Sequence, residues 1–158
     1  MDEEEVVKGI VEMLKGINNS AAELVHKGDL ENAVKMYELA EQTSLRFYFN
    51  DGAFVNRLYI AKIHIMEEDF NRAVDCLDIL EKYEVSPNVE NEIIQFYKEA
   101  GMILLKAGMN MEAEGNLKEA LRIFEKVHPH LNKKRANLVE KEIALLKSKV
   151  RTDVNPVC

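Results

Sequence analysis

The sequence predicts an all-α fold, a right-handed α-solenoid of three antiparallel helix pairs followed by a C-terminal capping helix. Two observations lead to this prediction. A similar segment recurs at a spacing of 40 residues, at residues 26–40, 66–80 and 106–120, and a fixed period of this length is typical of stacked helical repeats. Apolar residues in and around these segments recur in steps of three and four, which is the period of an amphipathic helix.

The composition limits the classes of function. The chain has 158 residues, of which 47% are hydrophobic, and this fits one domain with its own core. Its net charge of −7 disfavours nucleic acid as a partner, because binding phosphates needs a basic surface. No apolar run is long enough to span a membrane, and the first residues are acidic where a secretion signal is basic. With two cysteines and no disulfide framework, a cytoplasmic protein is expected.

The first helix pair is expected at about residues 14–50, in a single domain that covers residues 1–150. Apolar residues within 2–27 lie on one face of a helix. Gly28 is expected to end this helix as a left-handed cap. Asp29 follows in the position of an N-cap, so the second helix of the pair is expected to begin directly after it.

Residues 47–54, with the sequence Phe-Tyr-Phe-Asn-Asp-Gly-Ala-Phe, allow two interpretations. Aromatic residues on both sides of an Asp-Gly pair are typical of a β-hairpin. The helical spacing of the preceding segment continues to Tyr48, however, and a lone hairpin would have no sheet to join. We therefore predict that the helix extends to about Phe49 and that a turn follows it.

The second and third pairs are expected at residues 53–87 and 89–127, and the capping helix at residues 131–150. In the second pair Glu68 stands where the first pair has a glycine, so this turn has to close without one. Residues 151–158 are expected to be a disordered tail.

Small residues are expected where the helices of a pair cross, because helix axes approach to about 8 Å only across small side chains. The 40-residue period gives these crossings as Ala21, Ala61 and Gly101 on the first helices and Ala33, Ala73 and Ala113 on the second. The same period places the third turn at residues 107–109. It aligns Lys141 with the first-helix crossings, so the last helix is interpreted as a cap with a polar outer face.

The chain resembles the tetratricopeptide-like helical repeats, in a divergent form with a long repeat. The residues that carry the resemblance are Gly28-Asp29-Leu30, Ala33, Tyr37 and Ala40, then Asp69-Phe70, Ala73 and Leu77, then Tyr97, Ala100-Gly101, Leu104, Gly108, Ala113, Leu117 and Ala120. Common members of the family repeat at about 34 residues, and the proline that usually closes a repeat is displaced here to Pro87 and Pro129. The resemblance implies a non-enzymatic adaptor or regulatory subunit that binds a peptide or a partner helix in the concave groove lined by the first helices.

Carried onto this sequence, the resemblance places eight residues on that groove: Asn18, Val55, Leu58, Tyr59, Lys62, Lys98, Met102 and Leu105. Because this set is mostly apolar with a few positive charges, the expected ligand is an amphipathic helix or a mixed apolar and acidic peptide. The alternative is a structural homo-oligomer, or a subunit of a larger assembly, that buries the aromatic edge at residues 47–54.

No catalytic, cofactor or metal site is predicted. The sequence has no nucleophile elbow and no phosphate-binding glycine loop. His128 and His130 flank a proline but lack a third ligand at metal spacing. Cys76 lies beside Ala73 on an inner helix face, so a buried and unreactive thiol is expected there.

Two further features allow a binding role beside an ordinary one. Met102, Met109 and Met111 form either an adaptable binding surface or ordinary packing, and packing is the favoured interpretation. The basic cluster Lys133-Lys134-Arg135 is expected to be a solvated helix start, with contact to an acidic partner as the alternative.

Overall fold

The computed structural model describes residues 2–154, and within that range every regular element is helical. The elements, in chain order, are α1 (Glu3–His26), α2 (Leu30–Arg46), α3 (Asn50–Met66), α4 (Phe70–Leu80), η1 (Pro87–Val89), α5 (Glu90–Ala113), α6 (Leu117–Val127), η2 (His128–His130) and α7 (Lys133–Val154). This confirms the all-α class. The right-handed sense of the stack and the single-domain assignment stay predictions.

The last helix extends further than expected. α7 runs to Val154, so residues 151–154 are helical where a disordered tail was predicted. No glycine or proline stands between Lys133 and Pro156, so no helix-breaking residue ends α7 earlier. Residues 155–158, the rest of the predicted tail, lie outside the described residues.

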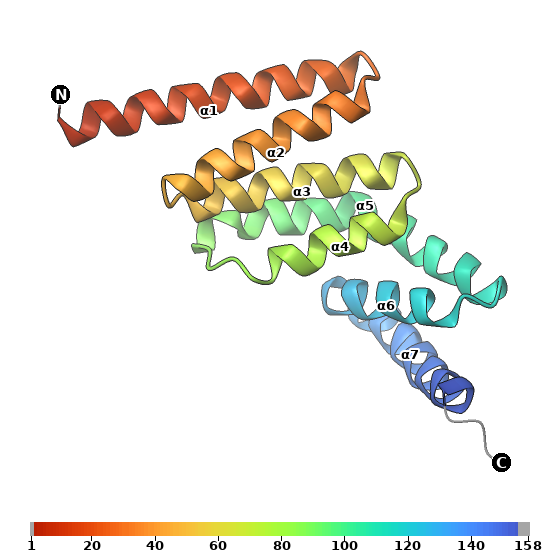
Figure 1. Ribbon diagram of the computed structural model, residues 1–158. Coiled ribbons are helices and arrows are strands. Elements are labelled where there is room, and N and C mark those ends of the chain that lie inside the picture. Colours follow the sequence, from red (N-terminus) through yellow and green to blue (C-terminus); the bar gives the residue numbers. More distant parts are fainter. Residues whose placement is uncertain (1, 155–158) are drawn as a thin grey trace.

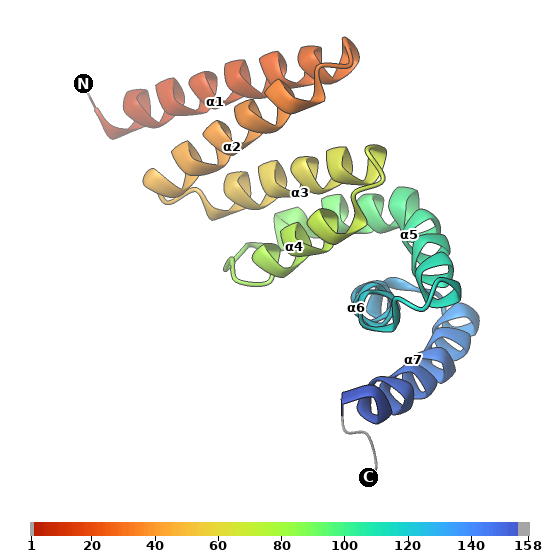
Figure 2. The same ribbon diagram turned by 45° about the vertical axis from the view of Figure 1, so that its right-hand side comes forward.

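The helices follow one another in an open arc with α1 and α7 at opposite ends (Figures 1 and 2). α3 is the most enclosed helix, because it packs against α2, α4 and α5. Beyond it α5 packs on α6, and α6 packs on α7. α1 packs chiefly on α2. The core therefore runs along the middle of the arc, and the two end helices are covered mainly from one side.

Four turns, those after α1, α2, α3 and α5, share one backbone motif. Each contains a residue with positive φ: Gly28 (79°), Tyr48 (61°), Glu68 (58°) and Gly115 (86°). The residue after each donates its N–H to a carbonyl five positions back, as Asp29 does to Leu24 at 2.9 Å. These bonds form the Schellman closure of a helix C-terminus. The prediction for Gly28 is confirmed, and Glu68 closes its turn in the left-handed conformation without a glycine.

The turn after α2 lies at residues 47–49, which corrects the prediction of a helix to about Phe49 and a turn after it. Tyr48 adopts the left-handed conformation, so α3 begins at Asn50, ahead of the expected residue 53. Gly52 is therefore inside a helix. A Cβ at Gly52 would lie 2.9 Å from Ser44 Oγ, so glycine serves the close approach of α2 and α3 there.

The third pair departs most from the prediction. α5 continues without a break through residues 107–109, and the left-handed glycine of its turn is Gly115, seven residues after Gly108. The buried crossings of the structure are Ala21, Ala61 and Gly108 on the first helices and Ala33, Ala73 and Ala120 on the second. The predicted Gly101 is also buried, but nothing lies within 4 Å of a Cβ built there. Ala113 is exposed. Seven residues are nearly two helical turns, so a register shifted by seven residues falls on the same helix face. Small and apolar residues therefore still aligned in the wrong register.

A buried ion pair joins α2 to α3 and to the segment after α4. Arg57 Nε donates to Glu41 Oε2 at 2.7 Å and Nη2 donates to Oε1. Tyr83 Oη donates to Glu41 Oε2 at 2.7 Å, and Glu41 is fully buried. Burial alone would lower the pKa of Arg57, but the hydrogen bonds and charge of Glu41 raise it above its usual value. Removing one partner of such a pair typically costs about 3–5 kcal/mol, so this cluster fixes α2 against α3.

Candidate functional site

The eight residues predicted for a shared groove do not line one surface. Leu58 and Leu105 are 3% and 8% exposed, so their side chains belong to the core. Asn18 lies on α1, beside a hollow that it shares with residues 48–52. Lys98 and Met102 lie on α5, where they line a second hollow next to η2.

The three remaining residues lie on α3, and their exposed parts are engaged with neighbours. The ring of Tyr59 packs on that of Tyr37, with the centroids 5.1 Å apart. Lys62 Nζ lies 5.4 Å from the centroid of the Tyr59 ring and 3.9 Å from Glu99 Oε2 on α5. Val55 is half-buried against the core. This part of the predicted groove thus mainly joins α3 to α2 and α5.

The aromatic edge of the alternative prediction is smaller than expected. Phe54 is 5% exposed and belongs to the core, and Phe49 is half-buried. Phe47 and Tyr48 remain exposed at the turn after α2. A self-association surface at residues 47–54 would therefore rest on two side chains.

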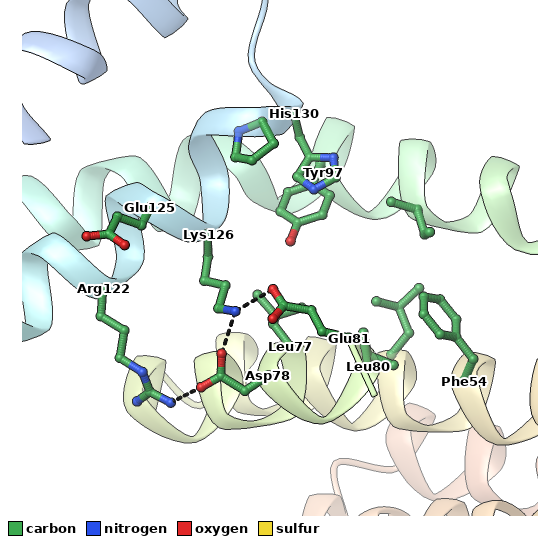
Figure 3. Close-up of a pocket in the computed structure, with 13 residues that line it drawn as sticks. Phe54, Leu77, Asp78, Leu80, Glu81, Tyr97, Arg122, Glu125, Lys126 and His130 are labelled. Carbon is green, nitrogen blue, oxygen red and sulfur yellow. Dashed lines mark hydrogen bonds and ion pairs between the residues drawn. The ribbon is translucent and has the colours of Figure 1, made fainter. Parts of the chain in front are cut away.

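A pocket of about 620 Å³ lies between α4, α5 and α6 (Figure 3). Ion pairs cross it: Lys126 Nζ lies 2.5 Å from both Asp78 Oδ1 and Glu81 Oε1, and Arg122 Nη2 lies 2.5 Å from Asp78 Oδ2. Burial opposes ionisation of Asp78, but the hydrogen bonds and charges of the two cations hold its pKa below the usual range.

On the aromatic side of this pocket, the two rings contact each other. The rings of Tyr97 and His130 stack with centroids 3.6 Å apart (Figure 3). Burial lowers the pKa of His130 and raises that of Tyr97, so both side chains are neutral at pH 7. The charged side chains of the pocket pair with one another, so we interpret it as part of the packing contact between α4 and α6.

A larger hollow, a groove with a volume of about 1040 Å³, lies between α5 and α7. α5 and α7 both pack on α6, and Phe124 of α6 lines the groove between them. Four large apolar side chains line the groove and are each 48–63% exposed: Met102, Ile103, Met109 and Leu138. Because these side chains are exposed, they do not serve as core residues. The groove is therefore the candidate functional site.

Polar side chains stand at both ends of the groove. Arg135 Nη1 lies 2.8 Å from Met102 Sδ at the start of α7. At the other end burial, with the charge and hydrogen bond of Glu142, raises the pKa of Glu112. Lys149 and Lys106 complete the charged rim. Such an apolar trough with a partly basic rim accommodates the apolar face of an amphipathic helix.

Met102 and Leu105 are the predicted residues that this groove contains. Met109 was named only under the less favoured interpretation of the methionines as a binding surface, and the 40-residue register placed it in a turn. A signal was present in α7, however. Val139 and Leu146 are buried against α6, while Leu138 and Leu145 repeat the same spacing one residue earlier and are exposed. α7 therefore carries more apolar surface than one neighbour covers.

Among residues 2–154, no three His, Cys, Asp or Glu side chains are grouped so that they could hold a metal ion. Over the same span, none of the helices has both the length and the apolar character needed to cross a membrane. A scan against protein-family models and searches of curated proteins and of solved structures find no significant match.

Proposed function

We propose that this protein is a non-enzymatic interaction module whose groove between α5 and α7 binds an amphipathic helix of a protein partner. The exposed apolar side chains around the groove support this proposal most directly, because large exposed apolar patches typically mark interaction sites. The resemblance to tetratricopeptide-like repeats and the cytoplasmic location remain predictions that agree with it.

The dimensions of the groove suit a short helical segment. Its α5 wall runs from Met102 to Ala113, which is about 16 Å at the helical rise and equals about three turns of a bound helix. Two of the exposed side chains are methionines, whose flexible thioethers adapt to the shape of an apolar partner. The charge of Arg135, with Lys133 and Lys134 before it, favours acidic residues beside the apolar stripe of the ligand.

Two designed helical peptides test the proposal. Both carry the same apolar stripe, one flanked by glutamates and the other by lysines, and fluorescence anisotropy measures their binding to the full chain. We expect the acidic peptide to bind more tightly and its affinity to fall as salt is added, because salt screens the basic rim. Met109→Glu should weaken binding by about tenfold or more, since it places a charge in the apolar centre of the groove.

Met66→Glu is the matched control. Met66 is 59% exposed and Met109 is 63% exposed, but Met66 lies at the end of α3, outside the groove. Affinity should be unchanged in this variant. The proposal fails if neither peptide binds, or if Met66→Glu and Met109→Glu weaken binding equally.

A further inference from the structure

The first half of α1 carries apolar side chains that α2 does not cover. α1 has 24 residues and α2 has 17, so α1 projects past the end of α2 by about 10 Å at the helical rise (Figure 1). Val6 and Val7 are 44% and 45% exposed on the projecting part, and Val11 and Met13, which follow it, are 38% and 45% exposed. These side chains form an apolar stripe that follows the helical period along one half of α1.

This stripe and α7, which forms one wall of the groove, carry opposite charges. Residues 2–12 contain five acidic residues and one lysine, a net charge of −4. Residues 133–154, which form α7, contain seven lysines and arginines and three acidic residues, a net charge of +4. The chain as a whole has a net charge of −7, so its basic charge is concentrated on the helix that forms one wall of the groove.

The two surfaces also agree in length. Along α1, Val6 and Leu14 are separated by about 12 Å, and along α5, Met102 and Met109 by about 10 Å. Within one molecule they cannot meet, because α1 and α7 lie at opposite ends of the arc in both views (Figures 1 and 2).

We infer that the groove between α5 and α7 binds the first half of α1 from a second copy of this chain. The inference rests on the proposed function, since it names the partner of that groove. The valines of α1 lie against Met102, Met109 and Leu138, and the acidic residues beside them lie along the basic start of α7. The contact joins two different surfaces, so it is heterologous and each bound copy still offers one free surface.

Two variants of the full chain test this arrangement. In the first, Val7→Asp with Val11→Asp charges the stripe of α1 and leaves the groove intact. In the second, Met109→Glu with Leu138→Glu charges the groove and leaves α1 intact. All four positions are exposed, so both variants should keep the helical circular dichroism and the unfolding midpoint of the parent.

Sedimentation velocity over a range of concentrations gives the readout. We expect the parent chain to form species larger than its single-chain mass of 18.1 kDa, and added salt to dissociate them. Each variant alone should remain a single chain. An equimolar mixture should form a complex of two chains and nothing larger, because one variant supplies the groove and the other supplies α1.

Three outcomes would overturn the inference: a parent chain that stays single at every concentration, variants that associate as the parent does, or a mixture that does not associate. The last two would place self-association on a different surface or on a symmetric contact. The peptide experiment separates these results from failure of the proposed function. If the acidic peptide still binds and Met109→Glu still weakens it, the groove is a binding site whose partner is another protein.

Discussion

Gly101 and Gly108 lie nearly two helical turns apart on α5, and their surroundings differ. A Cβ on Gly108 would lie 2.8 Å from Cε1 of Phe124, whose ring is buried and only 2% exposed. Nothing lies within 4 Å of a Cβ on Gly101. Packing therefore requires a glycine at Gly108, where α5 crosses α6. At Gly101 there is room for a Cβ, so packing does not require a glycine there.

The two glycines should consequently respond in opposite directions to alanine. Gly108→Ala should lower the free energy of unfolding by about 1–3 kcal/mol, because the added Cβ would lie 2.8 Å from Cε1 of Phe124 and would force this packed ring to shift. Gly101→Ala should raise it by up to about 1 kcal/mol, because alanine favours the helix. Urea unfolding followed by circular dichroism measures both. If Gly101→Ala were the more damaging change, the crossing would lie at the position that the 40-residue period predicts.

At the scale of the helices, α4 and α6 are held together by ion pairs across the pocket of Figure 3. Asp78 on α4 accepts from Lys126 and Arg122 on α6, and Arg122 also lies 2.6 Å from Asp75 Oδ1. The Asp78 side chain is 40% exposed, so water and salt screen these pairs and their contribution is modest. The lowered pKa of Asp78 nevertheless predicts how this contribution to stability changes with pH.

Folding lowers the pKa of Asp78 from its ordinary value of 3.8. A carboxylate with a lowered pKa stabilises the fold above its unfolded pKa, and this stabilisation is lost as pH falls through the folded pKa. Asp78→Asn should therefore be less stable than the parent chain at pH 7, and the difference should shrink as pH falls below 3.8 and disappear once pH is below the lowered folded pKa. Urea midpoints at a series of pH values measure this. Glu92→Gln, at an exposed position on α5, is the control, and a difference that stays constant with pH would contradict the role of the ion pairs.

Local signals in the sequence predict most helix boundaries but only part of the site. Asp29 and Asp69 accept from the backbone N–H of Asn32 and Arg72, as N-caps do, so these two starts were predictable. The third turn was not, because a shift of nearly two helical turns preserves the face on which small and apolar residues fall. The groove was not predictable either, since its width depends on the angle between α5 and α7. That angle results from how both helices pack on α6, which no local pattern encodes.

The same limit explains the buried ion pair and the distribution of the predicted groove residues. Glu41 and Arg57 belong to different helices, and only the crossing of α2 and α3 brings them together. Tyr59 and Lys62 have the spacing of one helix face, as expected, but that face contacts α2 and α5. Spacing along one helix therefore defined faces correctly, while the identity of each neighbour came from the stacking of the helices.

At the scale of the whole molecule, burial decreases from the middle of the arc to its ends. α3 contributes Ile60, Ala61 and Ile63 at 0–2% exposure, and it has neighbours on several sides. In α1, by contrast, the residues from Glu3 to Gly9 are all exposed. Local opening requires little loss of packing where few apolar contacts exist, so the ends of the arc should open independently of its centre.

Hydrogen exchange followed by mass spectrometry should show this gradient and its response to self-association. In dilute protein the amides of α3 should exchange most slowly and those of residues 3–14 among the fastest. Residues 3–14 form the exposed half of α1, and unfolding this half breaks few packing contacts. As the concentration rises, docking of α1 into the groove of a second copy should slow exchange in residues 3–14 and on the α5 wall near Met109, with no change in α3. Val7→Asp with Val11→Asp should abolish that concentration dependence and leave the dilute pattern unchanged. Equal protection of α1 and α3 at low concentration would instead show that the arc opens only as one unit, and protection confined to residues 47–54 would place self-association at the aromatic turn.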